Sequence, residues 1–219
     1  MRTRPALVID TQDQARIVAA LERWPDHEGF VGYRTRAFVY LLWDGALRTG
    51  AAVSLNVEQV VQESGSRIHV VAQATLRPHA TDYSARSFEM TDRARAAIAD
   101  YLKVARSGGS LAGARLTGPL WIATHPHGAQ KRMSQRTAVQ AWHTFISAVN
   151  GLSREDLQLD DVVLTGRVAF AKAANANTEL ISSHAGVRGR AAARYSEHLA
   201  PHSRTRDVIS QLNRQYRRK

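Results

Sequence analysis

Nearly every patterned stretch of this sequence repeats at the period of an α-helix, and one stretch alternates at the period of a β-strand. Apolar residues recur every three or four positions in residues 10–24, 32–47, 92–106 and 133–152. In residues 66–92 apolar and polar residues alternate, a Pro-containing turn follows, and a second extended run covers Arg86 to Met90. We therefore expect a mainly α fold with a small antiparallel β-sheet (α+β), the sheet being a hairpin or three strands.

Capping signals predict where these helices begin and end. Asp10 or Thr11 can cap the first helix, and the second is expected to end at Arg48. Ser134 can cap the clearest helix, which Asn150 and Gly151 would end. We expect the apolar face of that helix to consist of Val139, Trp142, Phe145, Ile146 and Val149.

The charge balance indicates a polyanionic partner. The 219 residues include 30 Lys and Arg against 19 Asp and Glu, a formal net charge of +11. Nucleic acid is the commonest such partner, because each phosphate contact releases counterions; the alternative is a soluble protein that is simply basic. With no cysteine, disulfides and thiolate chemistry are excluded. We expect a cytoplasmic protein, since no signal peptide or membrane-spanning segment is evident.

Four residues that can act on a phosphodiester occur in order along the chain. Arg48 lies in GALRTG, Arg167 in LTGRVAF, His184 in SSHAG and Tyr195 in ARYSEH. Each also has a plain structural interpretation: a helix C-cap, a surface arginine, a turn histidine bonded to backbone, and a half-buried aromatic residue. The histidines of THPHG, His125 and His127, have no third ligand in view and are interpreted as loop residues, so no metal site is expected.

From about residue 10 to residue 200 the chain resembles the catalytic domain of the tyrosine recombinase (phage integrase) family. GALRTGAAVSLNVEQV resembles its first-arginine motif, LTGRVAFAKAANA the second, SSHAG its histidine turn, and RYSEH the segment with the nucleophile. The resemblance implies that Arg48 and Arg167 clamp the scissile phosphate, that His184 assists, and that Tyr195 attacks phosphorus to form a 3′-phosphotyrosyl link. No cofactor or metal is implied.

The resemblance also implies partners and a domain plan. The partner is double-stranded DNA, with a homo-oligomer forming on it, and Arg188, Arg190 and Arg194 beside Tyr195 favour a DNA-facing position. Residues 1–202 would form one catalytic domain and residues 203–219 a basic tail helix. No N-terminal DNA-clamping domain is expected, so a partner protein is expected to supply the clamp.

The sequence departs from the family pattern at groups that move protons. Leu164 stands where the second motif usually has His or Lys, and residues 66–90 contain no lysine for a general acid. The basic residues there are Arg77 and Arg86, which are expected to contact DNA and could stabilise charge, but arginine gives up a proton poorly. The hypotheses are therefore a DNA breaking and rejoining enzyme of reduced activity, or a non-catalytic DNA-binding regulator or accessory protein on the same scaffold. An RNA-binding protein has only the charge in its favour.

Overall fold

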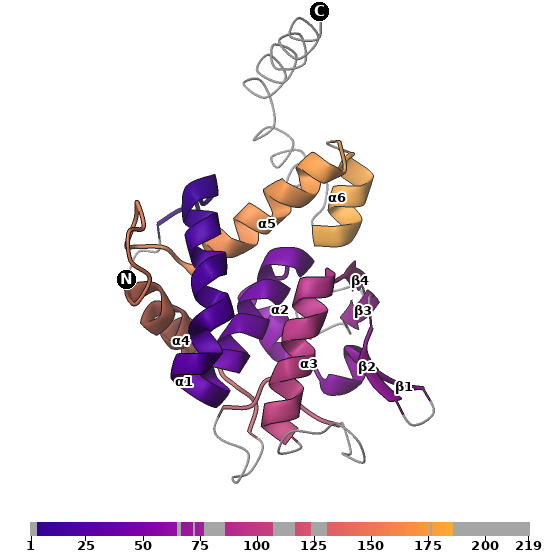
Figure 1. Ribbon diagram of the computed structural model, residues 1–219. Coiled ribbons are helices and arrows are strands. Elements are labelled where there is room, and N and C mark those ends of the chain that lie inside the picture. Colours follow the sequence, from indigo (N-terminus) through magenta and orange to yellow (C-terminus); the bar gives the residue numbers. More distant parts are fainter. Residues whose placement is uncertain are drawn as a thin grey trace, which may run out of the picture.

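Helices dominate the structure, and short strands lie along one side. In Figure 1, α1 (Thr11–Gly45) and α3 (Asp92–Arg106) lie side by side, α5 (Leu159–Ala173) and α6 (Thr178–Ala185) sit at one end, and the strands are at the edge. None of the described helices is long and apolar enough to cross a membrane. The computed structural model describes residues 4–64, 67–71, 73–76, 86–106, 117–123, 131–175 and 177–185.

The two helices expected before residue 48 form one kinked element, α1. Asp10 caps it by accepting hydrogen bonds from the backbone amides of Gln12 and Asp13, as predicted. The kink falls at Gly29, whose φ of 51° is left-handed. The expectation that the second helix ends at Arg48 is wrong, because α1 ends at Gly45 and a left-handed residue, Ala46, follows it.

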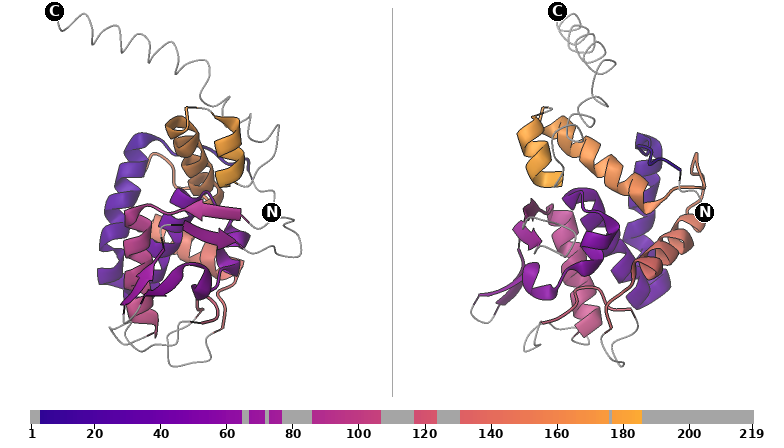
Figure 2. Two further views of the ribbon diagram at one scale, coloured as in Figure 1. Left: turned by 90° about the vertical axis from the view of Figure 1, so that its right-hand side faces the viewer. Right: turned by 180° about the vertical axis from the view of Figure 1, so that it is seen from behind.

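The strands form two separate pairs rather than one hairpin or a three-stranded sheet. β1 (Val61–Ser64) pairs antiparallel with β2 (Arg67–Val70), and β3 (Gln73–Leu76) pairs antiparallel with β4 (Arg86–Glu89). The first strand begins at Val61, earlier than residue 66, where the alternating pattern began. Val61 is partly buried against the core, next to the 3-10 helix η1 (Val57–Gln59). Figure 2 shows both pairs on the same side of the helical body.

The core joins α1, α3 and α4 (Gln135–Ser147) through aromatic packing. Trp121, Tyr101 and Phe38 are fully or almost fully buried, and the Phe38 and Trp121 rings meet edge to face at 5.2 Å. Ser134 caps α4 as predicted, and Trp142, Phe145 and Ile146 are buried. Val139 was wrongly placed on that buried face, because it is 40% exposed; Val149 is partly buried.

Candidate active site

Arg48 begins a helix instead of ending one. It is the N-cap residue of α2 (Thr49–Ser54), with extended backbone angles and no side-chain capping bond. Its side chain is exposed and makes no hydrogen bond or ion pair with any residue that the structure describes. Arg48 therefore does not cap the C-terminus of α1, and its guanidinium is available to an anion.

A glycine brings Arg167 to the same corner. Gly166 lies so close to α1 that a Cβ atom there would be 1.9 Å from the carbonyl oxygen of Trp43. Arg167, the next residue on α5, donates from Nε to the carbonyl oxygen of Ala46 at 3.3 Å. Because the two backbones nearly touch, the Arg167 side chain reaches the turn that carries Arg48.

His184 packs against this turn from the last turn of α6. Its Nε2 lies 3.0 Å from the carbonyl oxygen of Asp44, and its ring stacks on Phe170 with the centroids 3.8 Å apart. A carbonyl oxygen can only accept, so Nε2 carries the proton and donates it. The ring is buried, with 8% of the residue exposed. His184 thus makes the backbone bond that its structural interpretation anticipated. It also contacts the same turn as Arg167, which bonds to Ala46.

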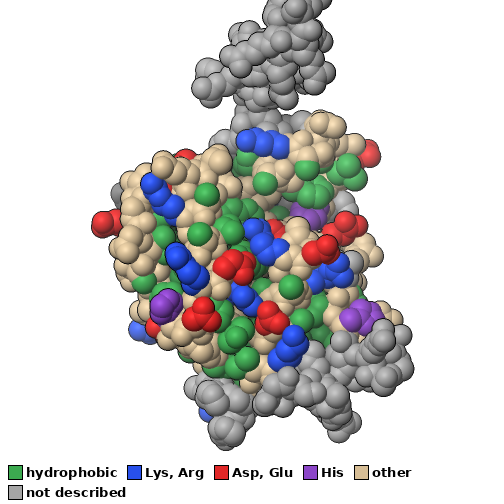
Figure 3. Space-filling view, in the orientation of Figure 1, with side chains coloured by type: hydrophobic (Ala, Val, Ile, Leu, Met, Phe, Trp, Pro, Cys, Tyr) green, Lys and Arg blue, Asp and Glu red, His purple; other side chains and the backbone are tan. Residues whose placement is uncertain are grey.

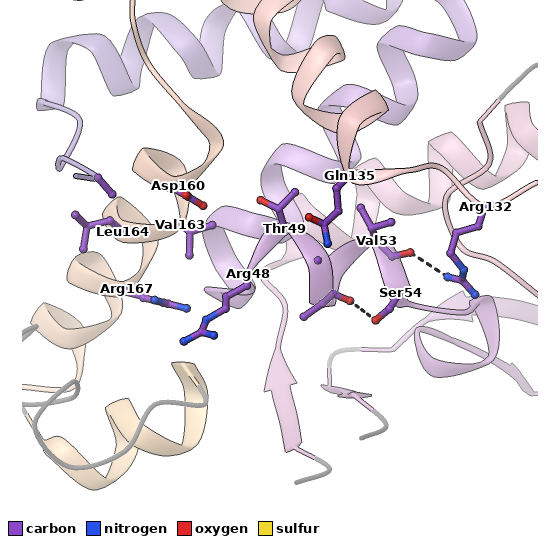
Figure 4. A pocket seen from close by; sticks show the side chains of 13 residues that line it. Arg48, Thr49, Val53, Ser54, Arg132, Gln135, Asp160, Val163, Leu164 and Arg167 are labelled. Atoms are coloured by element: carbon purple, nitrogen blue, oxygen red, sulfur yellow. Dashed lines mark hydrogen bonds between the residues drawn. The ribbon is translucent and has the colours of Figure 1, made fainter. Parts of the chain in front are cut away.

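One pocket of about 840 Å³ contains both arginines. Figure 4 shows Arg48 and Arg167 pointing toward the same space between α2 and α5. The first turn of α4 closes the other side with Gln135. The full lining consists of Ala6, Arg48, Thr49, Gly50, Ala51, Val53, Ser54, Arg132, Gln135, Asp160, Val163, Leu164 and Arg167.

Sequence reasoning did not single out Arg132, although it also lines the pocket. Its guanidinium donates to the carbonyl oxygens of Val53 at 2.9 Å and Leu55 at 2.8 Å, and so holds the end of α2. A basic residue two positions before the Ser134 cap was the available signal. Leu164, one helical turn before Arg167, lines the pocket with an apolar side chain and offers no proton.

The N-terminal segment fixes the far end of α5. The backbone amide of Leu7 donates to the Asp161 carboxylate at 2.7 Å, and that of Ile9 donates to the Thr165 hydroxyl at 2.9 Å. Arg4 donates to the same Asp161 carboxylate, and this hydrogen bond is the main reason that the pKa of Arg4 is raised. These bonds hold the first turns of α5, the helix that also carries Arg167.

The pocket and the outer face of α1 and α3 differ in charge. On that face Lys and Arg are interspersed with Asp and Glu (Figure 3), and Arg36 pairs with Asp100 at 2.8 Å. Among the described residues that line the pocket, Asp160 is the only carboxylate beside three arginines. Three arginines against one carboxylate make this described lining electropositive.

The remaining predicted site residues are not placed by the structure. Arg86 lies on β4, paired with Leu76, and only its backbone is described. The other members of the set lie outside the described residues: Tyr195, Arg77, Arg188, Arg190 and Arg194, together with His125 and His127.

Solved structures that share this architecture include recombinases and a transposon integrase. XerA recombinase matches with a TM-score of 0.66 and 15% identity, covering 95% of this chain and 66% of its own. XerH site-specific recombinase, bound to palindromic difH substrate in a post-cleavage complex, matches with a TM-score of 0.65 and 11% identity. That match covers 94% of this chain and 53% of the XerH chain. Tn1549 transposon integrase, in complex with transposon right end DNA, matches with a TM-score of 0.62 and 12% identity. That match covers 96% of this chain and 67% of the integrase chain.

The sequence comparisons give no corresponding match. No family model matches the sequence, and no curated protein matches it. The chain spans about half to two thirds of the length of the recombinases named above. At these identities the likeness establishes the architecture: the protein has the fold of a tyrosine recombinase catalytic domain.

Proposed function

We propose that this protein binds double-stranded DNA in the Arg48 and Arg167 pocket and breaks and rejoins a strand there. The observation that carries the proposal is the convergence of two arginines, 119 positions apart in sequence (167 minus 48), on one electropositive pocket. Two guanidiniums on one phosphate would neutralise the charge that builds on its non-bridging oxygens during attack.

Tyr195 is the proposed nucleophile. Its phenolic oxygen would lose its proton to solvent and form a bond to phosphorus, the bond to the 5′-oxygen would break, and that oxygen would take a proton from water and leave as a hydroxyl. The phosphotyrosyl diester retains the energy of the cleaved bond, so the reverse attack by a 5′-hydroxyl reseals the strand without ATP. Charge from the two arginines would favour the phenolate, since an unperturbed tyrosine has a pKa near ~10.

His184 is proposed to assist at the phosphate from its place against the turn that leads to Arg48, where its Nε2 donates to the Asp44 carbonyl. The family's other proton-transfer positions are Leu164 and a hairpin that lacks lysine, and loss of a general acid costs about 10²–10⁴ in rate. We therefore expect slow cleavage.

A suicide substrate tests the proposal. Nicked duplexes made from genomic DNA next to the gene are incubated with the protein and with Tyr195→Phe, then analysed on a denaturing gel and by mass spectrometry. The proposal predicts an adduct on Tyr195 that Tyr195→Phe does not form. Arg48-dependent DNA binding with no adduct would contradict strand cleavage and leave the non-catalytic DNA-binding alternative.

A further inference from the structure

A buried carboxylate anchors the turn that carries Arg48. The Asp44 side chain is 6% exposed, and its carboxylate accepts a hydrogen bond from the Thr91 hydroxyl and pairs with the Arg93 guanidinium at 3.2 Å. Thr91 precedes α3, and its hydroxyl also accepts from the backbone amide of Ala94 at 3.3 Å. Asp44 therefore ties the end of α1 to the start of α3.

The same turn holds two of the proposed site residues through its carbonyl oxygens. The Asp44 carbonyl accepts from His184 Nε2, and the Ala46 carbonyl, two residues on, accepts from Arg167 Nε. Arg48 follows after two more residues. The side chains that converge here come from α5, α6 and the start of α2. Two of them bond to this turn, and the third follows it directly in the chain.

We propose that Asp44 is a positioning residue for the phosphate site, acting through His184, Arg167 and Arg48. This inference rests on the proposed function. The carboxylate fixes the direction of the peptide groups at the end of α1, so that both carbonyl oxygens face their donors. Without that anchor the turn has more freedom, and the guanidiniums meet a phosphate in the productive geometry for a smaller fraction of the time.

The sign of the charge effect separates positioning from electrostatics. Asp44→Asn removes one negative charge from the protein, and so does Asp100→Asn on α3, where Asp100 pairs with Arg36 and Lys103. Electrostatics alone would make both variants bind DNA more tightly. Positioning predicts the opposite for Asp44→Asn, about threefold to tenfold weaker binding, which is the range for the loss of one ordinary hydrogen bond.

The experiment measures the dissociation constant of the full chain for a fluorescein-labelled random 30-base-pair duplex by anisotropy. The proteins are the unmodified chain, Asp44→Asn, Asp100→Asn, Arg48→Ala and Thr91→Val, which keeps the shape of Thr91 but removes its hydroxyl. Circular dichroism confirms that each is folded at the assay temperature. If Asp44→Asn does not fold, Thr91→Val decides, because it weakens the same anchor from the exposed side.

A spectroscopic measurement detects the positioning directly. At a pH where the imidazole is neutral, His184 in the unmodified chain should show the ¹⁵N shifts of a fixed Nε2–H tautomer. Asp44→Asn and Thr91→Val should move those shifts toward a tautomer average, and Asp100→Asn should leave them unchanged. A general loss of stability at this temperature would not change the tautomer in the folded protein.

The outcomes are distinct. Weaker DNA binding with altered His184 shifts in Asp44→Asn and Thr91→Val supports the positioning role. If Arg48→Ala weakens binding while Asp44→Asn binds as tightly as Asp100→Asn and keeps its His184 shifts, the positioning role is overturned and the proposed function stands. If Arg48→Ala leaves binding unchanged, the proposed phosphate site is itself wrong, and the inference fails with it.

Discussion

Arginines are held differently on the outer face of α1 and α3 and in the pocket between α2 and α5. On the outer face they meet carboxylates, as Arg36 meets Asp100 and Arg93 meets Asp44. In the pocket, Arg132 and Arg167 donate to backbone carbonyls, and Arg48 has no described partner. Carbonyls orient a guanidinium without cancelling its charge, so the second arrangement keeps positive charge in place for a polyanion.

The largest effect is expected where the pocket depends on backbone contact. Gly166→Ala places a methyl group 1.9 Å from the Trp43 carbonyl oxygen, so α5 must move away from α1. We expect a loss of about 1–3 kcal/mol in the free energy of unfolding and weaker DNA binding. Gly50→Ala is the matched control, because its Cβ would meet only the flexible Gln135 side chain. Urea unfolding measures the free energy of unfolding of both variants. Equal losses in the two would contradict this account.

Next in size is the loss of the exposed pocket arginine. Arg48→Ala should change stability by less than about 0.5 kcal/mol and weaken DNA binding about tenfold, with the salt slope of log Kobs reduced by about 0.9. Arg36→Ala removes the same charge from the outer face, where Arg36 pairs with Glu22 and Asp100. Titrations at several salt concentrations should show a smaller change for Arg36→Ala; equal changes would remove the distinction between the two regions.

A smaller effect sharpens the same comparison. Asp160→Asn removes the one carboxylate among the described pocket residues and should tighten DNA binding about threefold, as one fewer repulsion predicts. Asp100→Asn, on the outer face, should tighten it less. Competition binding at low salt measures the ratio of the two constants, and a ratio of one would show that DNA does not enter the pocket.

The smallest effect concerns acid stability at the N-terminal cap of α1. Hydrogen bonds lower the pKa of Asp10 below its ordinary value of 3.8, mainly the bond from the Asp13 amide. The ionised cap therefore contributes stability above the ordinary pKa, and the contribution is lost as the pH falls through the lower folded value. Asp10→Asn should flatten the acid limb of unfolding between about pH 5 and pH 2. An unaltered acid limb would contradict this assignment.

Local rules predicted the helices well and predicted the contacts between them poorly. Asp10 and Ser134 were identified as caps because a capping residue satisfies amides only two or three positions away. The two strand pairs, the exposed Val139 and the αL turn after Gly45 depend on tertiary packing, which periodicity does not encode.

The site was predicted as a set of residues and not as a geometry. Arg48 and Arg167 were found from their motifs, and the structure places both in one pocket. The contact that brings them together involves Gly166, and its sequence signal was a glycine inside a helix, which costs about 1 kcal/mol unless close packing uses it. Asp44 gave no signal, because its partners Thr91 and Arg93 lie 47 and 49 positions away.

The central claim is that Arg48 and Arg167 act on one phosphate, and a double-mutant cycle tests it most directly. DNA dissociation constants are measured for the unmodified chain, Arg48→Ala, Arg167→Ala and the double variant, with folding checked by circular dichroism. Two guanidiniums on the same phosphate predict a coupling free energy of at least about 0.5 kcal/mol. Additive losses, with no coupling beyond the error of the measurement, would show that the two arginines contact DNA independently and would contradict the shared phosphate site.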